Sequence, residues 1–272
     1  MITSDFAALT DALLPAVLEA GRVEMAYYAT GVTVQNKADA SPVTAADQEA
    51  EAILIKALAA AAPSIAVVAE ESSAAGHVAK IGATFFLVDP LDGTKEFIKK
   101  NGDFTINIGL IDNGRPVYGL VYAPAMDQLY VTIGQGNAVE TRIAPSCSAQ
   151  SLSDLQTTRL HTRMPPSEGL TALESRSHRS AATEDFFKTL PIHRVRAAGS
   201  SIKFCLIARG EADLYPRIGL TCEWDTAAAH AILEAAGGTV LQVDGSPMVY
   251  GKTAEKYLNP HFVAWGRAPR AA

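Results

Sequence analysis

Two short apolar runs in the N-terminal half end directly in acidic residues, and this pattern constrains the fold more than any other feature of the chain. Ile65–Ala69 leads into Glu70-Glu71, and Thr84–Val88 leads into Asp89. Short apolar runs bounded in this way are typical of buried strands. Ligands of open α/β sheets bind at the carboxyl ends of such strands. The sequence therefore predicts a sheet with carboxylates at one edge.

The second of these runs continues as Asp89-Pro90-Leu91-Asp92-Gly93-Thr94. Pro90 cannot extend a ladder, so the chain must turn and can bring both carboxylates to one side. Gly93 permits close approach of the backbone to a ligand, and the N–H groups at the start of a helical segment from Thr94 can point at a phosphate. Two close carboxylates repel each other unless a cation lies between them, and Mg²⁺ prefers such oxygen ligands. Taken alone, a capped turn that binds nothing is an equal alternative.

Three other acidic segments carry a structural reading beside a functional one. Glu70-Glu71 taken alone is typical of solvated loop charges. In Trp224-Asp225-Thr226, Asp225 has the position of an N-cap for an alanine-rich helix, and such a carboxylate can also point one oxygen at a metal. Thr44-Ala45-Ala46-Asp47 resembles a capping box with Asp in the final position, and Asp47 is also a candidate to orient a water. Together the four segments indicate a metal and phosphate site far more strongly than any one of them does.

The periodicity indicates two subdomains. In the first, covering 1–146, helices are expected over 5–28 and 44–62 and an antiparallel meander over 104–133, with Asn113-Gly114 as a hairpin turn. In the second, 147–272, helices are expected over 185–190, 200–209 and 226–236, followed by a strand over 239–243. We expect most metal ligands in the first subdomain, and Asp225 with the substrate-binding residues in the second.

Charge and composition exclude several classes of protein. The formal net charge is -6 and no basic stripe is present, which argues against a nucleic-acid partner. The three cysteines have no paired spacing, which argues against disulfides and zinc and favours the reducing cytoplasm. The N-terminal residues lack a basic signal-peptide region, and no apolar run approaches the ~18 residues of a membrane span.

Several segments resemble a known family. Ala69-Glu70-Glu71-Ser72, the Asp89–Thr94 motif and Trp224-Asp225-Thr226-Ala227-Ala228 resemble the signature motifs of the inositol monophosphatase superfamily. More specific features resemble its 3′(2′),5′-bisphosphate nucleotidase branch; they lie in 92–98, 175–178, 199–205 and 212–217. The resemblance extends from Asn36 to Pro260. It implies a mixed α+β and α/β fold, with layered αβαβα sugar-phosphatase-type architecture.

The resemblance also implies an activity. It is the Mg²⁺-dependent hydrolysis of the 3′-phosphate of adenosine 3′,5′-bisphosphate to AMP and phosphate, in sulfur assimilation and nucleotide recycling. Inhibition by lithium and a cytoplasmic location, with peripheral association at the inner membrane as a further option, are implied in the same way. The preferred nucleotide isomer, the 3′-phosphorylated sulfate donor as a substrate, and a monomeric or homodimeric state stay open.

Residue by residue, the resemblance implies a complete site. Glu70, Asp89 and the Leu91 carbonyl would hold one Mg²⁺, Asp89, Asp92 and Asp225 a second, and Glu70 could help to hold a third. Asp47 and Thr94 would orient the attacking water. The reacting phosphate would lie among these groups, namely Glu70, Leu91, Asp92, Gly93, Thr94 and Asp225. Lys203 and Arg217 are candidates for the 5′-phosphate, and Ser200 and His178 for the nucleotide; solvated positions are the alternative for Lys203, Arg217 and His178.

Three other functions share features with this sequence. Aspartyl-phosphate phosphatases place their two acids two residues apart, whereas Asp89 and Asp92 are three apart with Pro90 between them. Inositol monophosphatase or fructose-1,6-bisphosphatase activity is the alternative within the superfamily; Lys95 and the Gly-Ser-Ser-x-Lys segment favour a nucleotide. A non-catalytic sensor of phosphorylated metabolites would be expected to lack a catalytic acid, and all of the acids are present.

Overall fold

The structure is a computed structural model, and it describes residues 5–31, 35–36 and 42–267. Residues 37–41, which belong to the first segment of the family resemblance, lie outside this description. Within the described residues the α-helices are α1 (Phe6–Thr30), α2 (Ala45–Ala61), α3 (Glu70–Ala74), α4 (Thr94–Ile98), α5 (Ala181–Lys188), α6 (Ile202–Ala208) and α7 (Ala227–Ala235). Short 3₁₀ turns cover Pro124–Met126 and Leu152–Asp154.

A seven-stranded sheet forms the centre of the N-terminal half. Its strands are β3 (Ala66–Ala69), β4 (Thr84–Asp92), β5 (Thr105–Asp112), β6 (Arg115–Ala123), β7 (Gln128–Gly134), β8 (Asn137–Arg142) and β9 (Thr158–Arg159), which lie in this order across the sheet. Only β3 and β4 are parallel, and the other pairs are antiparallel. Asn113 and Gly114 both have positive φ, as a tight hairpin requires. The predicted meander and its turn are confirmed.

A five-stranded sheet forms the C-terminal half. It consists of β10 (Leu170–Ser175), β11 (Ile192–Ala198), β12 (Leu214–Arg217), β13 (Thr239–Gln242) and β14 (Phe262–Trp265), in the order β11-β10-β12-β14-β13. A separate two-stranded sheet pairs β1 (Gln35–Asn36) with β2 (Pro42–Val43). The strand expected over 239–243 is confirmed as β13, and the sequence did not predict the other four strands of the five-stranded sheet.

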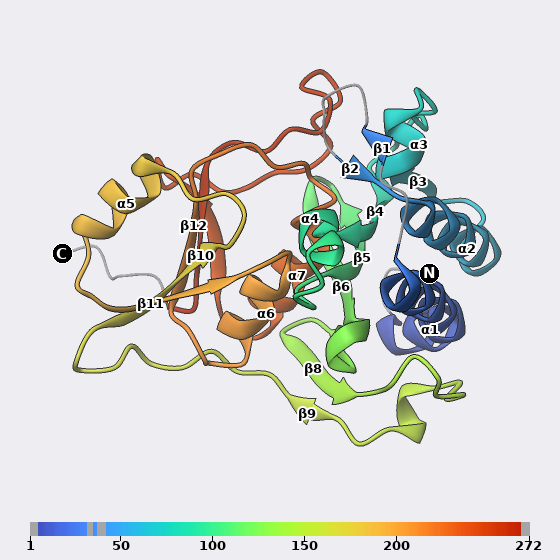
Figure 1. The fold of residues 1–272 in the computed structure, drawn as a ribbon, viewed down its shortest axis with the longest axis horizontal. Coiled ribbons are helices and arrows are strands. Elements are labelled where there is room, and N and C mark those ends of the chain that lie inside the picture. The colour runs from blue at the N-terminus through green and yellow to red at the C-terminus, as the bar shows by residue number, and fades with distance from the viewer. Residues whose placement is uncertain (1–4, 32–34, 37–41, 268–272) are drawn as a thin grey trace.

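The two sheets and their helices stack in five layers (Figure 1). Helices α1 and α2 cover one face of the seven-stranded sheet, where Leu13 and Leu54 are buried with Ile108. Helices α6 and α7 lie between the two sheets. Helix α5 covers the outer face of the five-stranded sheet, where Phe186 packs near Trp265. The predicted αβαβα architecture is confirmed.

The predicted boundary between the subdomains near Cys147 stays a prediction. Strand β9 still pairs with β8 of the first sheet, through Val139 with Arg159. The second sheet begins at Leu170.

Helix α5 begins at Ala181 rather than at the predicted Asp185, because the side chain of Ser180 accepts from the N–H of Thr183 and caps the helix there.

Helix α7 packs on the seven-stranded sheet with almost no space between the backbones. A Cβ added at Gly119 of β6 would lie 1.9 Å from the carbonyl oxygen of Ala228, and one at Gly109 of β5 would lie 2.8 Å from the Cβ of Ala227. Glycine on the sheet and alanine on the helix are therefore both required. This contact fixes the N-terminal end of α7, and with it Asp225, over β5 and β6; β5 is the neighbour of β4, the strand that carries Asp89.

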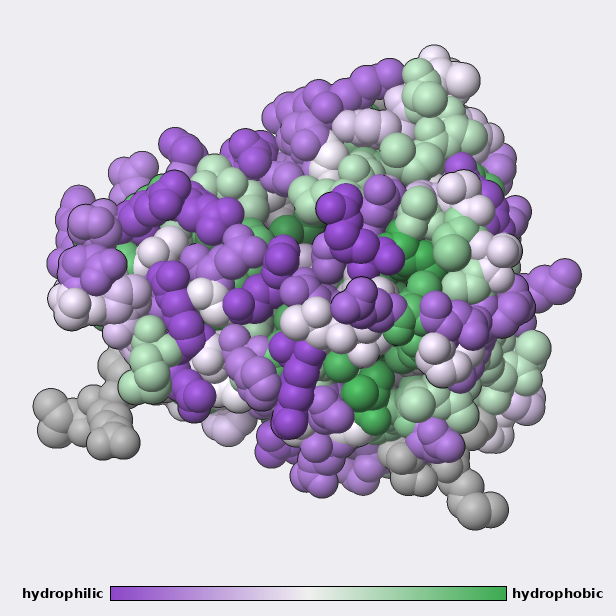
Figure 2. All heavy atoms as spheres, turned by 90° about the horizontal axis from the view of Figure 1, so that it is seen from below, coloured by the Kyte–Doolittle hydropathy of each residue, from purple (hydrophilic) through white to green (hydrophobic). Residues whose placement is uncertain are grey.

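The surface is mixed in character. Among the described residues, no helix is long and apolar enough to cross a membrane. In the view from below, hydrophilic residues dominate over the C-terminal half on the left, and hydrophobic residues show between them over the N-terminal half on the right (Figure 2).

Candidate active site

Three carboxylates from different elements meet at the end of the parallel strand pair. Glu70 begins α3 directly after β3, Asp89 lies in β4, and Asp225 precedes α7. Oxygen atoms of Glu70, Asp89 and Asp225 all lie within 4.8 Å of one another. The predicted convergence of acids at one edge of the sheet is confirmed. Hard carboxylate oxygens at this spacing form a donor set that fits a divalent metal ion.

The prediction that the strand ends at Val88 and that Pro90 forces a turn is wrong: β4 continues to Asp92 with a bulge over Pro90-Leu91, which takes Pro90 out of the regular ladder, and the tight turn follows at Gly93. Asp89 pairs with Asn107 and Asp92 with Thr105, with a register shift between them. The side chain of Asp89 accepts from the N–H of Leu91 at 3.0 Å. Gly93 has φ +96°, and a Cβ there would lie 2.9 Å from the carbonyl oxygen of Asp103. Both the conformation and the space therefore require glycine at this position.

The turn is also held from the other half of the molecule. The N–H of Ser201 donates to the carboxylate of Asp92 at 2.5 Å. The hydroxyl of Ser201 donates to Asn107 at 2.7 Å. The Gly-Ser-Ser segment before α6 therefore fixes the orientation of the Asp92 side chain.

Asp225 does not have the predicted N-cap role. The N-cap of α7 is Thr226, and no side chain caps this helix. One carboxylate oxygen of Asp225 instead accepts from the N–H of Cys222 at 2.9 Å. This bond holds the chain in a turn before the helix, and the carboxylate lies in the acidic cluster.

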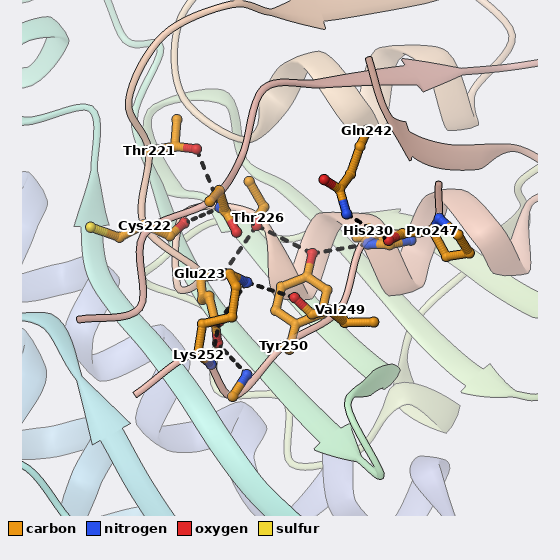
Figure 3. A network of polar contacts seen from close by, with 12 residues as sticks. Thr221, Cys222, Glu223, Thr226, His230, Gln242, Pro247, Val249, Tyr250 and Lys252 are labelled. Carbon is orange, nitrogen blue, oxygen red and sulfur yellow. Dashed lines mark hydrogen bonds and ion pairs between the residues drawn. The ribbon is translucent and has the colours of Figure 1, made fainter. Parts of the chain in front are cut away.

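A buried polar network holds this turn in place (Figure 3). The carboxylate of Glu223 is fully buried and accepts from the N–H groups of Gly251 and Lys252 at 2.7 and 2.9 Å. The amide of Asn259 donates to the carbonyl of Cys222 at 2.7 Å and to the hydroxyl of Thr226 at 3.0 Å. The residues on both sides of Asp225 are thus anchored by residues more than twenty positions later in the chain.

Asp47 lies behind the motif rather than in the acidic cluster. It is 2% exposed and accepts from the N–H of Thr44 at 2.8 Å, which completes the predicted capping box of α2. Its other oxygen accepts from the hydroxyl of Thr94 at 3.3 Å. The confirmed helix cap and the contact with Thr94 therefore use different oxygens of one carboxylate.

Burial disfavours the charged forms of the acids in this cluster. It raises the pKa of Asp92 to about 7, with Glu96 and Glu70 adding to the rise and Lys203 opposing it. Burial, followed by the charges of Asp92 and Glu70, raises the pKa of Asp225 well above its ordinary value. A bound cation would reverse both effects because it favours ionised ligands. The electrostatics therefore fit a metal site.

Cationic side chains line the same cleft as the carboxylates. Lys203 is buried, and its ammonium lies 4.9 Å from the centre of the Tyr215 ring. The Nε of Arg217 is buried and has no hydrogen-bond partner among the described residues. Lys95 lies 3.1 Å from the Nε2 of His178. Burial, together with the charges of Arg217 and Lys95, lowers the pKa of His178 to about 4, so its imidazole is neutral at pH 7.

The two halves of the cleft are linked by charged and polar contacts. Asp103 accepts from the guanidinium of Arg176 at 2.8 Å and from the N–H of Gly199 at 2.8 Å. The hydroxyl of Ser177 donates to Glu96, which follows the metal-binding motif. These contacts help to set the position of the cations Lys95, Lys203 and Arg217, called the cationic wall below, relative to the acidic cluster.

The cleft contains all but one of the residues that the sequence singled out. Those that line it are Glu70, Asp89, Leu91, Asp92, Gly93, Thr94, His178, Ser200, Lys203, Arg217 and Asp225. Asp47 reaches it through Thr94. Residues that the sequence did not assign to the site also line the cleft; they include Lys95, Glu96, Ser175, Tyr215, Thr221 and Thr226. Lys95 and Glu96 directly follow the motif and could have been included on that ground.

Comparison with known proteins identifies the family. The model of the inositol monophosphatase family matches residues 5–265. The chain belongs to this family. Among curated proteins, it is 44% identical to the 3′(2′),5′-bisphosphate nucleotidase CysQ of Shigella flexneri over 84% of this chain and 87% of that protein. It is 30% identical to CysQ of Haemophilus influenzae over 98% of this chain and 95% of that protein.

Solved structures agree with this assignment. CysQ from Bacteroides thetaiotaomicron, described as a bacterial member of the inositol monophosphatase family, superimposes with a TM-score of 0.77 at 34% identity, over 97% of this chain and 99% of that one. An inositol monophosphatase from Thermotoga maritima superimposes with a TM-score of 0.72 at 21% identity over 92% of this chain and 89% of that one, which shows the shared fold.

Proposed function

We propose that this protein is a Mg²⁺-dependent 3′(2′),5′-bisphosphate nucleotidase that hydrolyses adenosine 3′,5′-bisphosphate to AMP and phosphate. One observation carries the proposal: a single cleft is lined both by the cluster of carboxylates and by the cations Lys95, Lys203 and Arg217. A substrate with two phosphates matches this arrangement, because one phosphate can bind over the metal ions and the other can bind the cations. The bisphosphate nucleotidases among the chain's relatives support the same substrate.

The acidic cluster would hold the metal. Glu70, Asp89 and Asp225 offer converging oxygens, and Asp92 with the Leu91 carbonyl completes the set proposed for two or three Mg²⁺ ions. Bound there, Mg²⁺ would supply the positive charge that makes water nucleophilic at neutral pH and that offsets charge on the phosphate.

The side chains around this cluster direct the attack. Thr94 lines the cleft and its hydroxyl donates to Asp47, so its oxygen can take a proton from the attacking water while its own proton passes to Asp47. Asp47 is then the terminal proton acceptor. The new bond joins the water oxygen to phosphorus, the bond between phosphorus and the 3′-oxygen breaks, the leaving oxygen takes a proton from solvent water, and Asp47 returns its proton to solvent after release of the products. The N–H groups of Gly93 and Thr94 are proposed to hold the phosphate.

The cationic wall would hold the 5′-phosphate. The Nε of Arg217, which has no partner in the part of the chain that the structure describes, and the buried ammonium of Lys203 are suited to a phosphate, because a charge-assisted hydrogen bond gains strength in a buried site. His178 and Ser200 line the same cleft and are proposed to contact the nucleoside. We also propose a cytoplasmic location for the protein, as expected for this function.

A phosphate-release assay tests the proposal. Its panel contains adenosine 3′,5′-bisphosphate, the 2′,5′ isomer, the 3′-phosphorylated sulfate donor, 3′-AMP and inositol 1-phosphate, each with and without Mg²⁺. We expect Mg²⁺-dependent release with the highest kcat/KM on a nucleoside bisphosphate. A higher kcat/KM on inositol 1-phosphate would assign the protein to the inositol monophosphatases instead, and no release from any ester would reject an enzymatic role.

A further inference from the structure

A second buried carboxylate lies on α2, one turn after Asp47. Glu51 is 5% exposed, although its side chain is charged in its ordinary state. Residues four apart on a helix share a face, so Asp47 and Glu51 point toward the same side of α2. Buried acids are rare unless their oxygens have partners. The partners of Glu51 identify its role.

Both oxygens of Glu51 accept hydrogen bonds from the start of α3. One accepts from the N–H of Glu71 at 2.7 Å. The other accepts from the N–H of Ser72 at 2.8 Å and from its hydroxyl at 2.5 Å. All three donors lie in the first turn of the helix that begins with the metal-binding candidate Glu70.

The N-cap position of helix α3 supplies no side-chain cap. Its N-cap residue is Ala69, which makes no side-chain hydrogen bond. The first N–H groups of a helix lack partners within the helix, and a helix of five residues is too short to be stable by itself. The carboxylate of Glu51 therefore does for α3 what a capping residue does elsewhere, from a position twenty residues earlier in the chain.

We propose that Glu51 is a positioning residue for the metal site. It binds the N–H groups of Glu71 and Ser72 and so fixes the backbone at Glu70. The Glu70 carboxylate is thereby held close to those of Asp89 and Asp225. Glu51 also connects the metal site to α2, the helix that carries Asp47. These two acids of α2 have different roles in the proposed reaction. Asp47 accepts the proton of the attacking water, and Glu51 positions the metal ligand Glu70. This inference rests on the proposed metal-dependent function.

Metal binding without substrate tests this role in the full-length protein. In Glu51→Gln an amide NH₂ replaces one accepting oxygen, so one backbone N–H of α3 loses its partner. Titration calorimetry with Mn²⁺ should show an affinity about tenfold or more below that of the unchanged protein, as is typical when a residue that orients a metal ligand is replaced. Assays at saturating Mg²⁺ should recover most of kcat, because the reacting groups remain.

Glu49→Gln is the matched control. It removes the same charge from the same helix, but Glu49 is exposed and accepts from the hydroxyl of Tyr27 rather than from α3. We expect unchanged Mn²⁺ affinity in this variant. An equal loss of Mn²⁺ affinity in both variants would mean that the loss comes from removing a negative charge from α2, not from the contacts of Glu51 with α3. That result would overturn the inference.

Combining variants separates positioning from a merely structural effect. In a Glu70→Gln background, Glu51→Gln should weaken Mn²⁺ binding no further, because Glu51 acts through Glu70. The proposal would be overturned if the losses of Mn²⁺ affinity in the two single variants added up in the double variant. It would also be overturned if Glu51→Gln alone left the affinity unchanged. If Glu51→Gln does not fold, Ser72→Ala removes only the hydroxyl contact and should shift the affinity in the same direction by a smaller factor. Absence of Mn²⁺ binding to the unchanged protein would reject the metal-dependent function itself.

Discussion

The hydroxyl of Thr94 donates to the carboxylate of Asp47 at 3.3 Å and so joins the start of α4 to the start of α2. The Asp89–Thr94 motif and the Thr44–Asp47 capping box are more than forty residues apart, yet they meet here. Because Asp47 uses its second oxygen for the helix cap, the oxygen that faces Thr94 has a fixed direction. A fixed acceptor is what proton transfer from a positioned water requires.

Asp47→Asn should therefore lower kcat by about 10²- to 10⁴-fold, the usual contribution of a general base. An amide can still accept from Thr94 but cannot take up a proton. Metal affinity should change little, since Asp47 is not one of the converging carboxylates.

Thr44→Ala is the control for the helix cap. It removes the hydroxyl that accepts from the N–H of Ala46 and donates to the second oxygen of Asp47 at 2.6 Å, at a cost of about 1 kcal/mol of stability, but it keeps the carboxylate of Asp47 and its contact with Thr94. A loss of kcat in Thr44→Ala as large as in Asp47→Asn would mean that the cap and the orientation of Asp47, rather than its uptake of a proton, account for the effect.

The sequence predicted the parts of the site that depend on neighbouring residues. The capping box at Thr44, the strand before Asp89 and the turn at Gly93 all follow from local rules and are confirmed. Side-chain chemistry within a few residues decides such features.

The parts that failed depend on long-range contacts. Asp225 was expected to cap α7, but it accepts instead from the N–H of Cys222, in a turn that Asn259 and Glu223 hold. Glu51 was not singled out because its partners are twenty residues away and follow an ordinary strand. Spacing rules describe single elements, and these contacts exist only after the elements have packed.

Asp89→Asn should abolish Mg²⁺-dependent turnover and leave the fold intact. The change removes one negative charge from the centre of the three carboxylates, and a neutral amide is a much weaker ligand for Mg²⁺. Phosphate release and Mn²⁺ calorimetry measure the loss. Asp112→Asn is the control, because Asp112 accepts from Thr84 at the other end of the same strand pair. Retained turnover in Asp89→Asn would refute the shared-metal arrangement.

Gly119→Ala should both destabilise the protein and weaken metal binding. The new methyl group would lie 1.9 Å from the carbonyl of Ala228, so α7 must move outward and carry Asp225 with it. Overpacking of this kind costs about 1–3 kcal/mol or more, which thermal unfolding would show as a lower Tm. Gly134→Ala is the matched control in the same sheet, since no atom lies within 4 Å of its added Cβ. Equal Tm values for the two variants would contradict the close packing of α7.

Arg217→Met should distinguish bisphosphates from monophosphates. The variant removes a guanidinium from the cationic wall of the cleft. We expect KM for adenosine 3′,5′-bisphosphate to rise by about tenfold or more, as for the loss of a charged hydrogen bond, while kcat/KM for 3′-AMP is unchanged. Arg196→Met is the control, because Arg196 pairs with Glu211 outside the cleft. Equal effects of Arg217→Met on both substrates would remove Arg217 from the 5′-phosphate site.

Glu24 of α1 gives a pH dependence of stability that does not involve the metal site. Its carboxyl is fully buried, and neither oxygen has a hydrogen-bond partner among the described residues. Burial, with a smaller effect of the Asp47 charge, raises its pKa well above the ordinary 4.5. Below pH 4.5 both the folded and the unfolded chain hold this proton, so no penalty arises. As the pH rises through 4.5, only the unfolded chain ionises, and the folded state loses stability until its own raised pKa is reached.

Glu24→Gln should remove this penalty, because glutamine does not ionise and has nearly the same shape. The Tm of the variant should exceed that of the unchanged protein at about pH 8, and the difference should shrink toward about pH 4. Glu19→Gln is the control on the same helix, since Glu19 is exposed and pairs with Arg22; its Tm difference should not grow with pH. A Tm difference for Glu24→Gln that is constant over this range would show that Glu24 is ionised in the folded protein despite its burial.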